Sequence, residues 1–452
     1  MKRYIYIITA IIVVAIIAIA ALLYIKNSSL GGNGSSVVSS STTSGSLPIV
    51  GTQGSANGAG ASGSPLSLTP TTSSTAGGTT QTSAPVFGVL SNNPVAGYSV
   101  NAQNVVVAIQ PDGEVFTVTN GQTAIVNTST VSGIISVDFS LDGEKALVSY
   151  GDPNDPQTEV YNVASNVWIA LPAGMQSPQW SPVGGYTIAY LATTKSGGLA
   201  LQTMDATSAS SVKRGATTLL TLAATDLALQ WPMKDYFILS DKPTIVSPGS
   251  IWAFNASAGT LTSLIYNVPG AESVWSANAT TPYGLIFFDS GPQGVTRNLL
   301  LRSLYGGAPQ EQMSFLTLPS KCVFNNEMMP ITTSTIAAPS SSTPTSTKKT
   351  SRVAIPIRTA PTSTPYLALY CGIPRNSSGF SSANLPDDYN MMSLFTSDDI
   401  YKINLATNAV NPIWSDQTQN MDVSNMKIFN GTLFFVNRYD QKLYGLTNVT
   451  SQ

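Results

Sequence analysis

Between Tyr98 and Ile428 the chain repeats one pattern: a bulky apolar residue, a short turn of small polar residues, and then an apolar strand. One clear copy has Phe139 before the turn and 145–150 as the strand, and another has Trp180 before the turn. Apolar and polar residues alternate within these strands, which is the period of a β-strand with one buried face. The pattern predicts an all-β chain.

The bulky residue of each copy gives the period of the repeat. Its first five spacings are 41, 41, 51, 44 and 49 residues. A strand unit of about 40 to 50 residues must bury its apolar face on further copies, and a closed ring of such sheets is a β-propeller. We expect seven blades over 86–452, with six or eight as alternatives and a sandwich of unrelated strands as the competing fold. The aligned positions are Tyr98, Phe139, Trp180, Trp231, Trp275, Phe324 and Ile428.

The N-terminus has the pattern of a membrane anchor. Residues 4–25 are almost wholly apolar, long enough to cross a hydrocarbon layer of about 30 Å. Lys2 and Arg3 precede this run, Lys26 follows it, and no small-x-small cleavage site ends it. We expect an uncleaved transmembrane signal-anchor over 1–26, with a buried core helix as the alternative. The excess of cations before the run places the N-terminus in the cytoplasm and the ring outside a cytoplasmic membrane crossed once.

Two segments are poor in large apolar residues. Residues 27–85 are mainly Ser, Thr, Gly and Ala, which predicts a flexible, disordered linker. Residues 331–365 are rich in Ser, Thr and Pro and carry four cations, which predicts a low-complexity loop on one face of the ring. Without these four and the three cations beside the anchor, 14 Lys and Arg face 23 Asp and Glu. This negative balance argues against nucleic acid as a partner.

Residue types exclude several kinds of chemistry. The chain contains no His, so neither Ser-His nor Cys-His catalysis nor a His-ligated metal site is available. Two Cys are too few for a zinc site, and no phosphate-cradling Gly-Lys-Ser/Thr loop occurs. We therefore expect no catalytic residues, no cofactor and no enzyme activity.

The two cysteines flank the low-complexity segment. If Cys322 and Cys371 lie on adjacent strands of one blade, their sulfur atoms can meet. Such a bond would close a loop of about 50 residues and stabilise the fold by roughly 4 kcal/mol in the chain-entropy model. An exported compartment permits it. We expect a disulfide, with two free thiols as the alternative.

The densest acidic pairs supply the candidate binding residues. Adjacent carboxylates on a loop are commonly turn or cap residues, which is the alternative interpretation. They also offer oxygen ligands for Ca²⁺, although their spacing does not match the twelve-residue calcium loop. The candidates are Asp387, Asp388, Tyr389, Asp398 and Asp399.

Parts of the chain resemble known propellers. Segment 179–190, with Trp-Ser-Pro before an apolar strand, resembles the repeat of TolB-type and WD40-like propellers, although Val183 stands where that repeat has Asp. The C-terminal third is similar, in its short sequence motifs and in their order, to uncharacterised, single-anchor membrane propeller proteins of small-genome bacteria. This resemblance spans about 86–450 and implies a TolB-like fold in the cell envelope, with no functional residue to carry over. The matching segments are 318–324, 369–374, 385–389 and 397–403.

These observations favour one function and leave two alternatives. The leading hypothesis is a membrane-anchored, extracytoplasmic propeller that acts as a non-catalytic binding or scaffolding module for an envelope protein or glycan. A carboxylate-dependent hydrolase of envelope polysaccharide or ester would instead place two Asp or Glu in the channel, about 5 to 10 Å apart. A structural spacer at the cell surface is the third possibility.

Overall fold

The structure is a computed structural model that describes residues 85–450, except for 120, 129, 154, 278–281, 291–295, 306–310 and 329–364. All of these residues belong to one compact unit, Ser62–Gln452. The predicted anchor at 1–26 lies outside the described residues. So do the predicted linker at 27–85 and the predicted insertion at 331–365, apart from Pro85 and Pro365. Within the described part of the chain, no helix is both long and apolar enough to span a bilayer.

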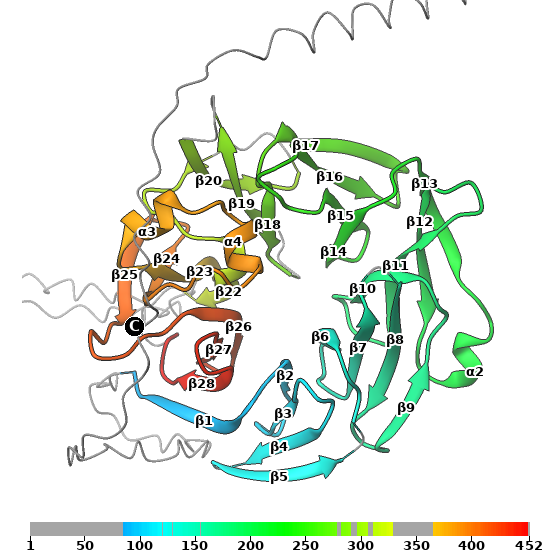
Figure 1. Ribbon diagram of the computed structural model, residues 1–452, viewed down its shortest axis with the longest axis horizontal. Coiled ribbons are helices and arrows are strands. Elements are labelled where there is room, and N and C mark those ends of the chain that lie inside the picture. The colour runs from blue at the N-terminus through cyan, green and yellow to red at the C-terminus, as the bar shows by residue number, and fades with distance from the viewer. Residues whose placement is uncertain are drawn as a thin grey trace, which may run out of the picture. The chain divides into compact units, whose positions relative to one another are not determined.

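Seven four-stranded antiparallel sheets form the blades of a propeller (Figure 1). Blade 1 contains β2 (Gly97–Val100), β3 (Val106–Ile109), β4 (Val115–Thr119) and β5 (Gln122–Asn127). Blade 2 contains β6 (Ile134–Phe139), β7 (Lys145–Asp152), β8 (Asp155–Asn162) and β9 (Val167–Ala170). Blade 3 contains β10 (Met175–Trp180), β11 (Thr187–Thr193), β12 (Leu199–Asp205) and β13 (Thr217–Leu222). Blade 4 contains β14 (Leu227–Met233), β15 (Tyr236–Asp241), β16 (Gly249–Asn255) and β17 (Thr260–Val268).

The remaining blades follow the same order until the last. Blade 5 contains β18 (Glu272–Trp275), β19 (Tyr283–Ser290), β20 (Thr296–Ser303) and β21 (Glu311–Gln312). Blade 6 contains β22 (Cys322–Met328), β23 (Pro365–Pro374), β24 (Asp398–Asn404) and β25 (Ala409–Trp414). Blade 7 contains β26 (Val423–Phe429), β27 (Thr432–Asn437), β28 (Lys442–Leu446) and, as its fourth strand, β1 (Phe87–Pro94). The helical turns are α2 (Ala209–Val212), η2 (Pro319–Lys321), α3 (Ser377–Ser382) and α4 (Asp387–Asn390).

The seven-bladed prediction is confirmed, and the sandwich alternative is wrong. Each of the seven aligned bulky residues lies in the first strand of its blade, from Tyr98 in β2 to Ile428 in β26. First strands of neighbouring blades contact each other, as β2 with β6, β6 with β10, β10 with β14, β18 with β22 and β22 with β26. The sequence repeat therefore marks the inner strand of each blade.

The ring is closed by its N-terminal strand. Figure 1 shows β1, in blue, alongside β28, in red, and Phe87 of β1 pairs with Leu446 of β28. The Phe87 ring also stacks on Trp414, with 4.8 Å between ring centroids, and on Tyr444 at 5.5 Å. The last blade is thus completed by the residues that precede the first one.

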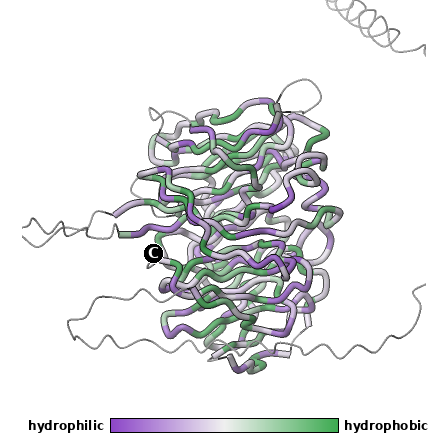
Figure 2. The backbone as a smooth tube through the Cα atoms, turned by 90° about the vertical axis from the view of Figure 1, so that its left-hand side faces the viewer, coloured by the Kyte–Doolittle hydropathy of each residue, from purple (hydrophilic) through white to green (hydrophobic). Residues whose placement is uncertain are grey.

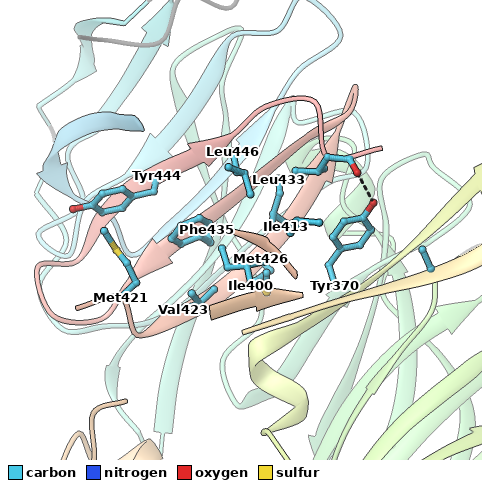
Figure 3. Packing of buried hydrophobic residues seen from close by; sticks show 12 residues of the cluster. Tyr370, Ile400, Ile413, Met421, Val423, Met426, Leu433, Phe435, Tyr444 and Leu446 are labelled. Carbon is cyan, nitrogen blue, oxygen red and sulfur yellow. Dashed lines mark hydrogen bonds between the residues drawn. The ribbon is translucent and has the colours of Figure 1, made fainter. Parts of the chain in front are cut away.

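A buried apolar cluster lies between every two neighbouring blades. Blades 1 and 2, for example, share one that includes Ile109 and Tyr161. Figure 3 shows the cluster between blades 6 and 7, where Tyr370 and Ile400 face Phe435 and Leu446. Figure 2 shows hydrophobic and hydrophilic stretches interspersed along the described chain. Because the seven clusters join all seven blade pairs, each blade buries its faces against its two neighbours.

The predicted disulfide is confirmed. Cys322 and Cys371 are directly opposite each other on β22 and β23, and their sulfur atoms are bonded. Both side chains are buried in the cluster between blades 5 and 6. The bond joins the two strands on either side of the predicted insertion.

Candidate functional site

The first three predicted binding residues lie in a loop of blade 6. This cap segment, residues 375–397, connects β23 to β24 and contains α3 and α4. The Asp387 carboxylate accepts hydrogen bonds from the Thr244 hydroxyl (2.8 Å) and the backbone N–H of Ile245 (3.1 Å), both in a loop of blade 4. The Asp388 carboxylate accepts from the backbone N–H of Asn384 (2.7 Å). The cap segment therefore bridges to blade 4, and its two carboxylates have protein partners.

Tyr389 and Asp398 belong to a buried charge cluster. Asp398 Oδ2 lies 2.7 Å from Lys321 Nζ, and neither side chain is exposed. The same ammonium group pairs with Asp422, which also pairs with Arg438 at 2.7 Å. The Tyr389 ring lies against both cations, with its centroid 4.8 Å from Lys321 Nζ and 3.6 Å from Arg438 Cζ. Residues from blades 6 and 7 and from the cap segment thus meet in one ion cluster.

Opposing effects set the protonation of Lys321. Complete burial lowers the pKa of its ammonium group, but the neighbouring carboxylates, Asp398 foremost, outweigh burial and raise that pKa above its ordinary value. Lys321 is therefore charged at any physiological pH. Its charge holds together the cluster that surrounds it.

Asp399, the last predicted residue, lies outside this cluster. Its carboxylate pairs with Arg375 at 2.6 Å. Across the described ranges, no group of three or more Asp, Glu or Cys side chains is placed to hold a metal ion. Tyr389 and Asp398 thus lie together in one cluster. Asp387, Asp388 and Asp399 each contact other residues of the protein instead. Their role in ligand binding stays a prediction.

A concave site lies away from the predicted residues, among the inner strands of blades 2, 3 and 4. This channel-side pocket has a volume of about 650 Å³, within the range of roughly 300 to 1,000 Å³ that is usual for ligand pockets. Its walls are 135–138 of β6, 175–179 of β10, and Thr225, Asp226 and Leu229 at β14. Ser149, Pro153, Pro156 and Lys242 complete the lining.

The strands that form two walls of the channel-side pocket are both bulged. The pairing of β6 with β7 shifts register between Ile134 and Ser136, and the pairing of β10 with β11 shifts between Gln176 and Gln179. Ser177, inside the second bulge, has φ = 47°, in the left-handed region that non-glycine residues rarely adopt. Bulges re-aim side chains and are common beside functional sites.

The uncommitted hydrogen-bonding groups of the channel-side pocket are neutral. Gln176 Oε1 is buried and accepts no hydrogen bond from the described residues. Buried polar atoms are nearly always paired, so this oxygen needs a donor that the described chain does not supply. Ser136 and Ser177 also line the pocket, and a serine hydroxyl can both donate and accept.

The charged residues of the channel-side pocket face opposite charges. Asp226 lies 2.6 Å from Lys242, and both side chains are well exposed. Burial raises the pKa of Asp138, and the charge of Lys427 only partly offsets that effect. The charges at the site therefore balance locally, and Asp138 holds its proton more tightly than an exposed aspartate.

Sequence reasoning missed Gln176 and Ser177. The repeat correctly marked β10 as an inner strand through Trp180, but Gln and Ser are common in any strand or turn. The only local signal is Pro178, which lacks a backbone N–H and so interrupts strand pairing.

Comparisons with known proteins give distant structural likenesses. No protein-family model and no curated protein matches this chain. The propeller domain of the trilobed protease from Pyrococcus furiosus is 11% identical, with 68% of this chain and 77% of that chain covered and a TM-score of 0.37. Tricorn protease is 10% identical over 83% of this chain and 36% of its own, with a TM-score of 0.42. TolB from Acinetobacter baumannii is 11% identical over 78% of this chain and 63% of its own, with a TM-score of 0.35.

At these identities the likeness concerns the fold alone. The chain has the predicted propeller fold, and TolB proteins are among the solved structures that it resembles. The similarity to single-anchor proteins of small-genome bacteria stays a prediction.

The predicted function needs correction. We expected a non-catalytic binding or scaffolding module for an envelope protein or glycan, and this prediction is wrong. The similar solved structures are mostly propellers of peptidases, including acylaminoacyl peptidase and prolyl endopeptidases, and none of them supports a non-catalytic role. The recurring blades gave no information on this point, because the same ring occurs within enzymes. The prediction that this chain is not itself an enzyme stays a prediction.

Proposed function

We propose that the ring receives an extended polypeptide segment, as ligand or as substrate, in the channel-side pocket. The observation that carries the proposal is the buried Oε1 of Gln176, to which no described residue donates a hydrogen bond. A peptide group offers an N–H for this acceptor and a C=O for a hydroxyl donor. Ser136 and Ser177 provide such hydroxyls on the two bulged walls.

The other residues of the pocket lining favour a polypeptide ligand without charged side chains. Asp226 is neutralised by Lys242, and Asp138 lies in the field of Lys427, so none of the charged residues described in the lining is left without a counter-charge. The aliphatic side chains of Ile135 and Met175 lie beside the polar groups. A polypeptide segment with small or apolar side chains matches this mixture.

A polypeptide fits the channel-side pocket better than a glycan does. Sugar rings pack their C–H faces on flat aromatic side chains, which combine a large apolar surface with a polar edge. None of the described residues that line the pocket is aromatic. The pocket therefore lacks the platform that a sugar would use.

The test uses full-length protein and a library of neutral tetrapeptides capped at both ends. Bound peptides should lose about tenfold in affinity for Gln176→Leu, because one hydrogen bond to a buried acceptor is removed. Gln122→Leu is the matched control, since Gln122 is exposed on the outer strand β5. Equal affinity for wild type and Gln176→Leu would overturn the proposal, as would displacement of the peptides by neutral oligosaccharides.

We further propose that residues 4–25 anchor the protein in the cytoplasmic membrane with the ring outside. The apolar run and its flanking cations support this orientation. The bonded pair Cys322 and Cys371 adds support, because structural disulfides persist mainly in exported compartments. Protease added to intact cells should digest the ring, whereas protection until the cells are lysed would contradict the orientation.

A further inference from the structure

Arg302 differs from the other arginines of the ring. Five arginines fall within the described residues, and four of them pair with an aspartate. Arg302 forms no ion pair with any described residue, although it is only partly exposed. Burial lowers the pKa of its guanidinium group, and no described carboxylate offsets that effect. A half-buried cation without a counter-ion is costly in a folded protein.

Strand geometry explains where this cation points. Successive side chains on β20 alternate between the two faces of blade 5. Leu299 and Leu301 face one way, and Leu299 packs in the cluster with blade 6. Arg302 lies on the other face, which is turned toward blade 4. Leu304, just after the strand, packs in the cluster shared with blade 4, and the Arg302 guanidinium donates to the backbone C=O of Leu264 on β17. Glu311, on the neighbouring strand, is paired with Leu301 and so lies on the opposite face from Arg302.

Arg302 lines a small pocket between blades 4 and 5 that is separate from the channel-side pocket. Its volume is about 190 Å³. Thr260 and Thr262 of β17 add hydroxyl groups to the lining. Tyr236 and Tyr305 form an aromatic wall, with 5.5 Å between ring centroids and an interplanar angle of 75°.

These groups match the chemistry of an oxyanion. A guanidinium group has five N–H donors in a planar fork, and the contact with Leu264 uses one of its nitrogen atoms. The remaining donors suit two oxygen atoms of a carboxylate or a phosphate, and hydroxyl groups can donate to a third. The apolar faces of the two tyrosines suit a small apolar group attached to that anion.

We propose that Arg302, Thr260 and Thr262 form an oxyanion-binding site, with Tyr236 and Tyr305 holding the organic group that carries the anion. The ligand is a small organic carboxylate or phosphate. This site is independent of the polypeptide pocket proposed above.

Titration calorimetry on the full-length protein tests the proposal with phenyl phosphate, benzoate and phenol as probes. Phenyl phosphate or benzoate should bind, with the tighter of the two identifying the anionic group, and phenol should bind at least tenfold more weakly. Arg302→Gln should weaken binding at least tenfold, and Arg302→Lys should retain part of the affinity, because Lys keeps the charge but not the fork.

Two variants make the outcome independent of any folding defect. Thr262→Val removes one hydroxyl from an exposed strand position and should weaken binding severalfold. Arg214→Gln is the matched control, since Arg214 is exposed and paired with Asp205, and binding should be unchanged. The proposal is overturned if neither anion binds at millimolar concentration, if phenol binds as tightly as the anions, or if folded Arg302→Gln and Thr262→Val bind like wild type.

Discussion

The ammonium group of Lys321 lies 2.7 Å from the carboxylate of Asp398, and both side chains are completely buried. Lys321 ends the turn before β22, and Asp398 begins β24, so the pair joins two parts of blade 6 that are separated by the cap segment. Through Asp422 and Arg438 the same cluster reaches blade 7. Burial makes each charge of this cluster dependent on its partners.

Lys321→Met should therefore destabilise the ring strongly. The substitution leaves Asp398 buried without its cation, and breaking a buried pair in this way costs about 3–5 kcal/mol. Chemical denaturation followed by tryptophan fluorescence measures the loss. Lys242→Met is the control: the exposed pair with Asp226 should contribute no more than about 1 kcal/mol. Similar losses for both variants would contradict the structural role of the buried cluster.

Removing the disulfide should also reduce stability. The bond between Cys322 and Cys371 closes a loop over a sequence separation of 49 residues, and the chain-entropy model gives it roughly 4 kcal/mol. A Cys322→Ala, Cys371→Ala double variant should show this loss in denaturation without reductant. With reductant present, wild type and double variant should become similar. Alkylation of two free thiols in native, unreduced protein would show that the bond does not form.

Closure of the ring depends on β1. Phe87 packs on Trp414 and Tyr444 where the N-terminal strand completes blade 7. Phe87→Ala should lower the free energy of unfolding by up to about 3 kcal/mol, because the phenyl side chain is only partly buried. Val86→Ala, at the exposed neighbouring position, should have little effect. Hydrogen exchange should show faster opening of blade 7 in Phe87→Ala, and unchanged exchange there would argue against closure through this strand.

Stability should fall in alkaline solution, in part through Tyr370. This side chain is fully buried and its hydroxyl donates to Glu327. Burial, and then the nearby Glu327 carboxylate, raise the pKa of Tyr370 above its ordinary value of about 10. Because the folded protein holds this proton more tightly than the unfolded chain, the stabilisation is complete below pH 10 and declines as the pH rises above it.

Tyr370→Phe should reduce that dependence on pH. Denaturation midpoints measured from pH 7 to 11 should fall less steeply for Tyr370→Phe than for wild type, although the variant is less stable at pH 7. Tyr266→Phe, at an exposed position, should follow the wild-type slope. A slope that is the same in all three proteins would exclude Tyr370 as a contributor.

Much of the fold could be predicted from the sequence because its signals are local. The spacing of bulky residues from Tyr98 to Ile428 identified seven inner strands, since each blade repeats the same order of strand and turn. The positions of Cys322 and Cys371 around the low-complexity segment predicted their bond correctly. The candidate sites were harder to predict. Adjacent aspartates drew attention to Asp387 and Asp398, whereas no residue pattern distinguished Gln176 or Arg302.

The sequence by itself determined the blade, because alternating apolar residues and turn signals act within about 50 residues of chain. Only the tertiary structure decided which residues meet across the ring: β1 with β28, Asp387 with Thr244, and Arg302 with the backbone of Leu264. These contacts depend on the curvature and closure of the whole circle, which sets the distance between groups far apart in sequence. The same closure decided that Gln176 and Arg302 face pockets in which no described residue donates to Gln176 Oε1 and no described carboxylate pairs with Arg302.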